Sequence, residues 1–144
     1  MRYAELQVTS HFSFLRGASS NDELFATAAE LGIEALGIVD RNSLAGIVRA
    51  WEAAKATGVR LIVGCRLDLA DGMSILVYPT DRAAYSRLCR MLSLGKKRGG
   101  KAKCVLHWDD VTAYAEGLVA ILVPDEADDL TALHLRRLRD AFPG

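Results

Sequence analysis

Short apolar runs alternate with amphipathic stretches along this chain. Runs at 6–8, 33–39 and 59–69 are bounded by polar or glycine-containing segments, and apolar residues at helical spacing lie between them. The pattern predicts strands over these three ranges, the last bent at Gly64, and helices over 21–31 and 44–57. Asn42 or Ser43 would cap the second helix, and Gly58 would end it. The residues expected to face inward are Leu24, Phe25, Ala28 and Leu31 on the first helix, and Leu44, Ile47, Val48, Trp51 and Ala54 on the second.

The second half continues with a hairpin and more helices. Asp71-Gly72 is a strong turn signal, so residues 73–78 are expected to pair back antiparallel on the third strand. Helices are predicted over 81–94, 108–115 and 129–142, and an apolar strand over 118–123. Residues 96–103 are predicted to form a basic, glycine-containing loop. The inward positions would be Tyr85, Leu88, Cys89 and Leu92, then Leu130, Leu133, Leu138 and Phe142.

This order of elements predicts an α/β fold in a single domain, residues 1–144. Strands alternating with helices of this length form a largely parallel sheet with helices packed on it. Either an isolated four-strand sheet or the first part of a barrel agrees with the pattern.

The stretch 5–23 carries the opening β-loop-α unit. Its strand breaks into a polar loop, and Ser20 and Glu23 form a capping box at the start of the helix. Ligands of α/β proteins usually bind beyond the carboxyl ends of strands, so this loop is the first place to look for chemistry.

The amino-acid composition and charge argue against several classes of function. The 144 residues are 51% hydrophobic and 25% charged, with a formal net charge of zero, so no overall basic field attracts nucleic acid. No apolar run reaches the roughly 18 residues of a membrane span, and residues 1–5 open no signal peptide. We expect a soluble cytoplasmic protein. Three cysteines without CxxC spacing predict free, mostly buried thiols: Cys65, Cys89 and Cys104.

Two strand-end residues are candidates for chemistry. His11 lies beside the hydroxyl residues Thr9, Ser10 and Ser13, which would suit a hydrolytic site. No nucleophile elbow is present, however, and a loop histidine bonded to nearby backbone is the simpler interpretation. Asp40 follows the second strand. It would bind a metal or, as we favour, cap the next helix and brace the loop.

Three arginines would gather at one end of the sheet if strands one to three are neighbours. They are Arg16, Arg41 and Arg66, and together they would suit a carboxylate or a phosphate. Ion pairing with Asp40 and Asp68 is the alternative that we favour.

One dense basic cluster follows the third helix. Five cations in eight residues with two glycines would track a phosphate backbone or form a solvated loop: Lys96, Lys97, Arg98, Lys101 and Lys103. No aromatic residues alternate with them, so base stacking is not indicated.

Several motifs then occur in a recognisable order. They are YAEL at 3–6, SFLRGAS at 13–19, DRNSLAG at 40–46, LIVGCR at 61–66, YPTDRAAY at 78–85 and RLC at 87–89. Together they resemble the N-terminal PHP (polymerase and histidinol phosphatase) domain of bacterial C-family DNA polymerases. The similarity is greatest to the error-prone, damage-tolerant type of the replicative alpha subunit.

The resemblance implies the first part of a distorted (β/α) PHP barrel, with mostly parallel strands and one antiparallel hairpin. Polymerase catalysis in this family belongs to a distant palm domain, where carboxylates hold Mg²⁺. This fragment would therefore need no cofactor and would not synthesise DNA by itself. Its partners would be the rest of the polymerase chain and, through it, DNA; exposed barrel edges would also favour homo-oligomers.

The positions that hold metal ligands in metal-competent PHP domains differ here. By the motifs, they fall on Gln7, Thr9, Arg16, Arg41 and Arg66, none of which is a good ligand of a divalent cation. Three buried arginines would also repel a cation. The resemblance thus implies a structural scaffold with a degenerate metal site, and arginine–carboxylate bridges in its place. There are two alternatives. One is a residual metal-dependent phosphoesterase or proofreading activity, and the other is binding of DNA or of a partner through residues 96–103.

Overall fold

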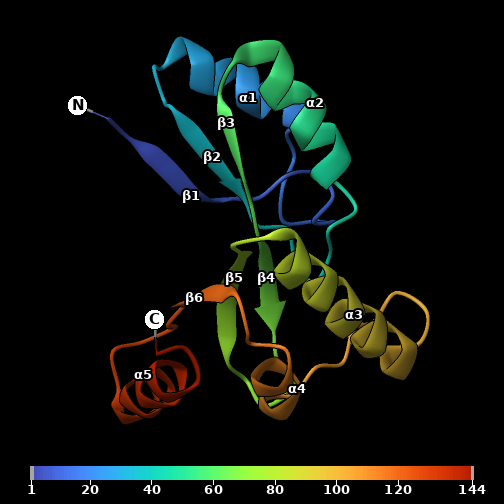
Figure 1. The fold of residues 1–144 in the computed structure, drawn as a ribbon, viewed down its shortest axis with the longest axis vertical. Coiled ribbons are helices and arrows are strands. Elements are labelled where there is room, and N and C mark those ends of the chain that lie inside the picture. Colours follow the sequence, from blue (N-terminus) through green and yellow to red (C-terminus); the bar gives the residue numbers. More distant parts are fainter. Residues whose placement is uncertain (1, 144) are drawn as a thin grey trace. The chain divides into compact units, whose positions relative to one another are not determined.

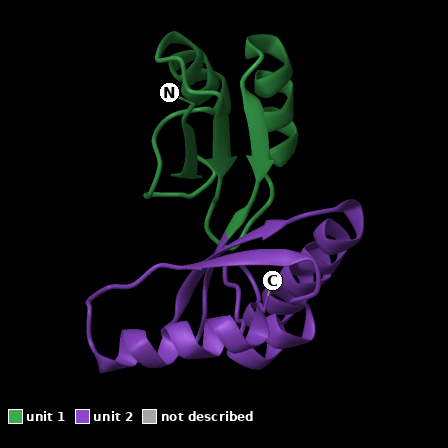
Figure 2. Cartoon of the chain, turned by 60° about the vertical axis from the view of Figure 1, so that its left-hand side comes forward, with its two compact units in different colours: residues 1–65 green, residues 66–144 purple. Residues whose placement is uncertain are grey.

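The chain folds as two units whose boundary in the sequence lies between Cys65 and Arg66 (Figure 2). A computed structural model describes residues 2–143. None of the helices within these residues is long and apolar enough to cross a membrane.

The first unit is a parallel three-stranded sheet with two helices. Its elements are β1 (Ala4–Val8), α1 (Asn21–Glu30), β2 (Ala35–Ile38), α2 (Ile47–Thr57) and β3 (Arg60–Val63), with strand order β1-β2-β3 (Figure 1). β2 is buried along its whole length, whereas β1 is an edge strand in which no residue is fully buried. The predicted capping box of Ser20 and Glu23 is present at the start of α1.

Both helices pack on the same side of β2. The core joins Phe25 and Ala28 of α1, Leu36 and Ile38 of β2, and Ala50 and Ala53 of α2. Small alanines at the contact allow the two helices to approach each other closely. Phe25 and Ala28 were predicted to face inward, but three other predicted core residues are exposed: Leu31, Val48 and Trp51.

Helix α2 begins three residues later than predicted. Its N-cap is Gly46, which provides no side-chain cap, and Ser43 instead accepts a hydrogen bond from the N–H of Ala45. Asn42 has a positive φ of 49°, which is not the extended conformation of an N-cap residue, so it does not take the capping role predicted for it. The turn after β2 therefore occupies the residues that the sequence pattern assigned to the helix.

The long third strand of the prediction is two strands. β3 ends at Val63, and β4 (Cys65–Asp68) begins after Gly64 and belongs to a different sheet. The expected bend at Gly64 is therefore a break between sheets.

The second unit is built on an antiparallel sheet of order β4-β5-β6. Its other elements are β5 (Ser74–Pro79), α3 (Arg82–Gly99), α4 (Trp108–Ala113), β6 (Leu118–Leu122) and α5 (Asp129–Ala141). The predicted Asp71-Gly72 turn joins β4 to β5, and Gly72 has a φ of 93°. β6 pairs antiparallel with β5, from Ile75 opposite Leu122 to Pro79 opposite Leu118. The α/β class with parallel strands and an antiparallel hairpin is confirmed.

Helix α3 is longer than predicted. Asp81 caps it by accepting a hydrogen bond from the N–H of Ala84 at 2.7 Å, and the helix continues to Gly99. The predicted loop over 96–103 is therefore wrong in its first half, because Lys96, Lys97 and Arg98 form the last helical turn. Cations there interact favourably with the helix dipole, which helps the helix to extend.

Helix α5 is less buried than its pattern suggested. Leu138 is buried, but Leu130 and Leu133 are 56% and 42% exposed. On β6, Val119 and Ile121 are also exposed, at 50% and 39%. These four side chains give the second unit considerable exposed apolar surface.

Candidate functional site: a buried carboxylate after strand β2

Asp40 is a buried carboxylate immediately after β2, with 2% of its surface exposed. Its Oδ1 accepts hydrogen bonds from the N–H of Ser10 and the hydroxyl of Ser13, both at 2.8 Å. Its Oδ2 accepts one from the Ser10 hydroxyl at 2.7 Å. Ionised acceptors form the stronger hydrogen bonds in proteins, so these three bonds join the β1–α1 loop firmly to the end of β2.

The two serines complete a closed network in which each hydroxyl both donates and accepts. The Ser10 hydroxyl accepts from the N–H of Phe12 at 3.2 Å, and the Ser13 hydroxyl accepts from the N–H of Arg41 at 2.9 Å. Both serines are almost fully buried. The buried polar groups of this loop are thus satisfied by one another, as burial requires.

Gly17 closes the same loop. A Cβ on Gly17 would lie 2.3 Å from the carbonyl oxygen of Ser10, so only glycine fits there. The N–H groups of Arg16 and Gly17 both donate to the carbonyl of Ser13, at 2.9 Å and 3.1 Å. The SFLRGAS motif therefore encodes a compact loop folded over its own backbone.

Cys65 contacts the backbone of Asp40. Its fully buried thiol donates to the backbone carbonyl of Asp40 at 3.4 Å and approaches that of Ser43 at 3.6 Å. The burial predicted for the Cys65 thiol is observed, while Cys89 and Cys104 are only half-buried.

The network gives Asp40 the predicted loop-bracing role. The helix-capping role is not observed, because α2 begins at Ile47. In the sequence, Ser10 and Ser13 stand out only as neighbours of His11, and their role as partners of Asp40 was not predicted. The available signal was two small hydroxyl residues in a loop that adjoins an aspartate at the end of the neighbouring parallel strand.

The residues at the predicted metal positions do not form a ligand set. In the first unit, Gln7, Arg16 and Arg41 are exposed and Thr9 is half-buried. The prediction that the arginines are buried is wrong for Arg16 and Arg41, whose long charged side chains extend to solvent. Within residues 2–143, no group of three or more His, Cys, Asp or Glu side chains is placed to hold a metal ion. Guanidinium, amide and hydroxyl groups do not fit a divalent cation here.

Arg66 lies on β4 of the second sheet and not on the third strand of the first sheet, as the sequence pattern had it. Its Nε donates to Oδ1 of Asp68 at 2.9 Å, and the Ser74 hydroxyl donates to the same oxygen at 2.7 Å. Both charged side chains are mostly buried, at 26% and 17% exposure. The expected arginine–carboxylate pairing is thus present for Asp68, whereas the expected pairing with Asp40 is wrong, because the described partners of its carboxylate are Ser10 and Ser13.

His11 is an exposed loop residue. Its Nδ1 lies 3.3 Å from the carbonyl oxygen of Ser19, and its ring packs on Phe12 with 4.7 Å between the centroids. These contacts agree with the simpler interpretation of a loop histidine bonded to backbone.

The basic cluster is divided by Gly100, which ends α3 with a φ of 71°. Lys101 and Lys103 follow it in a turn. Arg98 donates to a carboxylate oxygen of Asp110, and this bond raises the pKa of Arg98 and lowers that of Asp110. One of the five cations is therefore neutralised within the second unit.

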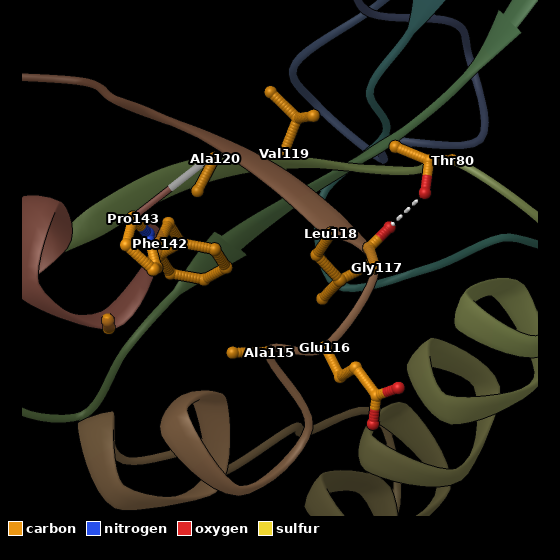
Figure 3. A pocket seen from close by; sticks show the side chains of 10 residues that line it. Thr80, Ala115, Glu116, Gly117, Leu118, Val119, Ala120, Phe142 and Pro143 are labelled. Atoms are coloured by element: carbon orange, nitrogen blue, oxygen red, sulfur yellow. Dashed lines mark hydrogen bonds between the residues drawn. The ribbon is translucent and has the colours of Figure 1, made fainter.

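A hollow of about 430 Å³ lies beside the start of β6 (Figure 3). Apolar side chains such as Leu118 and Phe142 line it, and the hydroxyl of Thr80 donates across its edge to the carbonyl of Gly117 at 2.8 Å. Among the described residues that line it, Glu116 alone is ionisable, and its side chain is 87% exposed. The hollow thus offers no converging polar groups for catalysis.

Comparison with known proteins agrees with the motifs. Residues 5–141 match the PHP domain family. The chain belongs to this family. Over 142 residues, this PHP domain is 74% identical to Error-prone DNA polymerase 2 of Rhizobium meliloti, and over 144 residues it is 54% identical to the error-prone DNA polymerase of Caulobacter vibrioides. Each alignment covers 99% of this chain and 13% of the relative, so the PHP domain spans about an eighth of these proteins.

Solved structures support the fold. An amidohydrolase from Chromobacterium violaceum matches with a TM-score of 0.76 at 14% identity, over 96% of this chain and 74% of the other. A putative metal-dependent phosphoesterase from Bifidobacterium adolescentis matches with a TM-score of 0.56 at 22% identity, over 80% of this chain and 44% of the other. The family match and the sequence relatives confirm the resemblance to PHP domains of error-prone polymerases.

Proposed function

We propose that this chain is the N-terminal PHP region of an error-prone DNA polymerase, where it acts as a structural scaffold with a degenerate metal site. The observation that carries the proposal is the 74% identity to a named error-prone polymerase over 99% of the chain. The longer protein would copy damaged DNA in the cytoplasm during replication and repair. Its nucleotidyl transfer would use Mg²⁺ held by carboxylates outside these residues.

The chemistry of the strand ends supports a scaffold. The carboxylate of Asp40 uses both oxygens to hold Ser10 and Ser13, so its lone pairs are engaged in bracing the loop. Gln7, Thr9, Arg16, Arg41 and Arg66 occupy the positions that the family pattern assigns to metal ligands. A hydrogen-bonded network would therefore hold the strand ends where other PHP domains use a metal.

The phosphoesterase alternative has less support. It needs a free base or a metal, whereas Asp40 is enclosed by three donors and His11 is directed at the backbone of Ser19. The likeness to a putative phosphoesterase, at 22% identity, supports the fold alone.

The remainder of the polymerase chain is the partner that we propose for the exposed apolar side chains of α5 and β6. Val119 and Ile121 alternate along β6, an edge strand whose free side would accept another strand. In the isolated chain, the same edge would favour self-association. Sedimentation at increasing protein concentration tests this: the isolated chain should associate, and the longer protein should not associate through this surface.

Primer extension by the longer protein that contains residues 1–144 tests the main proposal. Extension with Mg²⁺ on intact and damaged templates is expected. Gln7→Ala and Thr9→Val should leave the rate unchanged because these side chains hold no catalytic metal. Asp40→Ala should lower the melting temperature and the active fraction together. The absence of any extension, or its loss in Gln7→Ala and Thr9→Val at an unchanged melting temperature, would overturn the proposal.

A further inference from the structure

The charges of this chain are strongly segregated. Eight of its 18 basic residues, and none of its 18 acidic residues, lie between Arg82 and Lys103. Because the whole chain has a formal net charge of zero, the remaining residues are collectively negative. The segment includes all of α3, so a local positive field is concentrated on one helix.

One face of α3 presents these charges to solvent. Five exposed residues with spacings of four, four, three and four positions lie within an arc of about 80°, namely Arg82, Ser86, Arg90, Ser93 and Lys97. We name this face the α3 basic stripe. The opposite side of the helix is buried through residues such as Leu88 and Met91. At 1.5 Å per residue, the three cations extend over about 22 Å.

Helix stability does not account for the stripe. Cations in the last turn complement the helix dipole, which explains Lys96 to Arg98. Arg82 stands in the first turn, where a cation opposes the dipole, and the adjacent N-cap carboxylate of Asp81 is engaged with the N–H of Ala84. A charge that opposes the local electrostatics suggests an external partner.

Internal ion pairs do not account for it either. Arg98 pairs with Asp110, and Arg87 donates to the carbonyl of Glu116 at 3.0 Å. Within residues 2–143, by contrast, no hydrogen bond or ion pair involves the side chain of Arg82, Arg90 or Lys97. Arg87 and Arg98, which face away from the stripe, are thus bonded within the protein. The cations of the stripe remain available to an external partner.

We propose that the α3 basic stripe binds the phosphate backbone of duplex DNA without reading its sequence. The small serines between the cations let a backbone approach the helix closely. The stripe has no aromatic side chain on which unpaired bases would stack, which favours duplex over single-stranded DNA. It also has no exposed apolar pocket that would anchor an acidic peptide. The choice of DNA among polyanions rests on the proposed function. Of the five basic residues singled out in the sequence, only Lys97 belongs to the stripe.

Binding of a fluorescent duplex to the longer protein, measured by anisotropy without nucleotide and at several salt concentrations, tests the stripe. The variant Arg82→Gln, Arg90→Gln, Lys97→Gln removes the three cations from exposed positions. If each neutralises one phosphate, the slope of log K against log salt should become shallower by about 2.7. The matched control Arg60→Gln, Arg136→Gln, Arg137→Gln removes the same charge from other exposed positions and should change the slope little.

An unchanged slope in the stripe variant would overturn the inference, as would an equal change in both variants, which would report net charge alone. Loss of primer extension with unchanged DNA affinity would also overturn it and would indicate an acidic protein partner. Circular dichroism confirms that both variants are folded. Because no nucleotide is present, a protein that binds DNA through the stripe but extends no primer would refute the proposed function and leave this inference standing.

Discussion

Ser10 contacts both oxygens of the Asp40 carboxylate, with its N–H 2.8 Å from Oδ1 and its hydroxyl 2.7 Å from Oδ2. The two residues are 30 positions apart and lie at the ends of neighbouring parallel strands. This pair joins the β1–α1 loop to β2 at the edge of the sheet where related folds place their chemistry. An ionised side chain here serves as a structural brace.

Asp40→Asn should destabilise the protein strongly. The amide nitrogen of the new asparagine would face a hydrogen-bond donor, from which it cannot accept. Hydrogen bonds to a charged acceptor would also be lost, and we expect a total loss of stability of about 2–4 kcal/mol. Urea unfolding measures the change. Asp71→Asn, at an exposed turn, is the control and should change stability by less than about 0.5 kcal/mol. Equal effects of the two substitutions would contradict the bracing role.

Leu15→Asn should stabilise the isolated chain. Leu15 has a φ of 62° and is 89% exposed, so the left-handed backbone is strained without compensating burial. Asparagine tolerates this conformation, and a gain of about 1 kcal/mol is expected in thermal unfolding. Leu31→Asn is the control, because Leu31 is also exposed but has a φ of −80°. A gain in the control and none at Leu15 would refute the argument from strain.

Gly17→Ala should cost more than Gly46→Ala. At Gly17 the new methyl would meet the backbone oxygen of Ser10 at 2.3 Å, and the loop backbone is fixed by the Asp40 network. At Gly46 the nearest atom is 2.7 Å away on the ring of Phe12, which is 38% exposed and can rotate away. We expect a loss of about 1–3 kcal/mol at Gly17. Denaturant midpoints compare the two, and a larger loss at Gly46 would be inconsistent with a rigid loop.

Stability should depend on pH through Asp110. Its hydrogen bond with Arg98 and that from the N–H of His107 lower its pKa in the folded state. A lowered carboxyl pKa adds stability above the pKa of the unfolded chain, and this contribution is lost as the pH falls through the folded value. Arg98→Gln should therefore be less stable than the parent at about pH 7 and converge with it at about pH 2. A constant difference across this range would show that Arg98 acts through packing instead.

The elements of the fold were largely predictable, because apolar runs and caps are local signals. The capping box at Ser20, the turn at Gly72 and the strand 118–123 were placed correctly. The faces of the helices were less predictable. Trp51 follows the helical period but remains exposed, since the core contact of α2 is made by the small residues Ala50 and Ala53. Leu133 of α5 was likewise predicted to face inward and is exposed.

The candidate site was only partly predictable. Asp40 and the Arg66–Asp68 pair were identified from their positions on strands. The partners of Asp40 were not predicted, because their contact depends on how the irregular loop between Thr9 and Gly17 folds. The helical and strand periodicities of the sequence carry no information about that loop. The length of α3 was missed for a related reason: glycines and lysines suggested a loop, while the helix dipole and the Arg98–Asp110 pair stabilised another turn.

Metal content tests the central claim most directly. The protein is stripped with chelator, incubated with Zn²⁺ or Mn²⁺, dialysed and measured by elemental analysis alongside calorimetric titration. A scaffold whose ligand positions hold Gln7, Thr9, Arg16, Arg41 and Arg66 should retain no stoichiometric metal and show no saturable heat. One tightly bound ion per chain, lost on substitution of Asp40, would contradict the account.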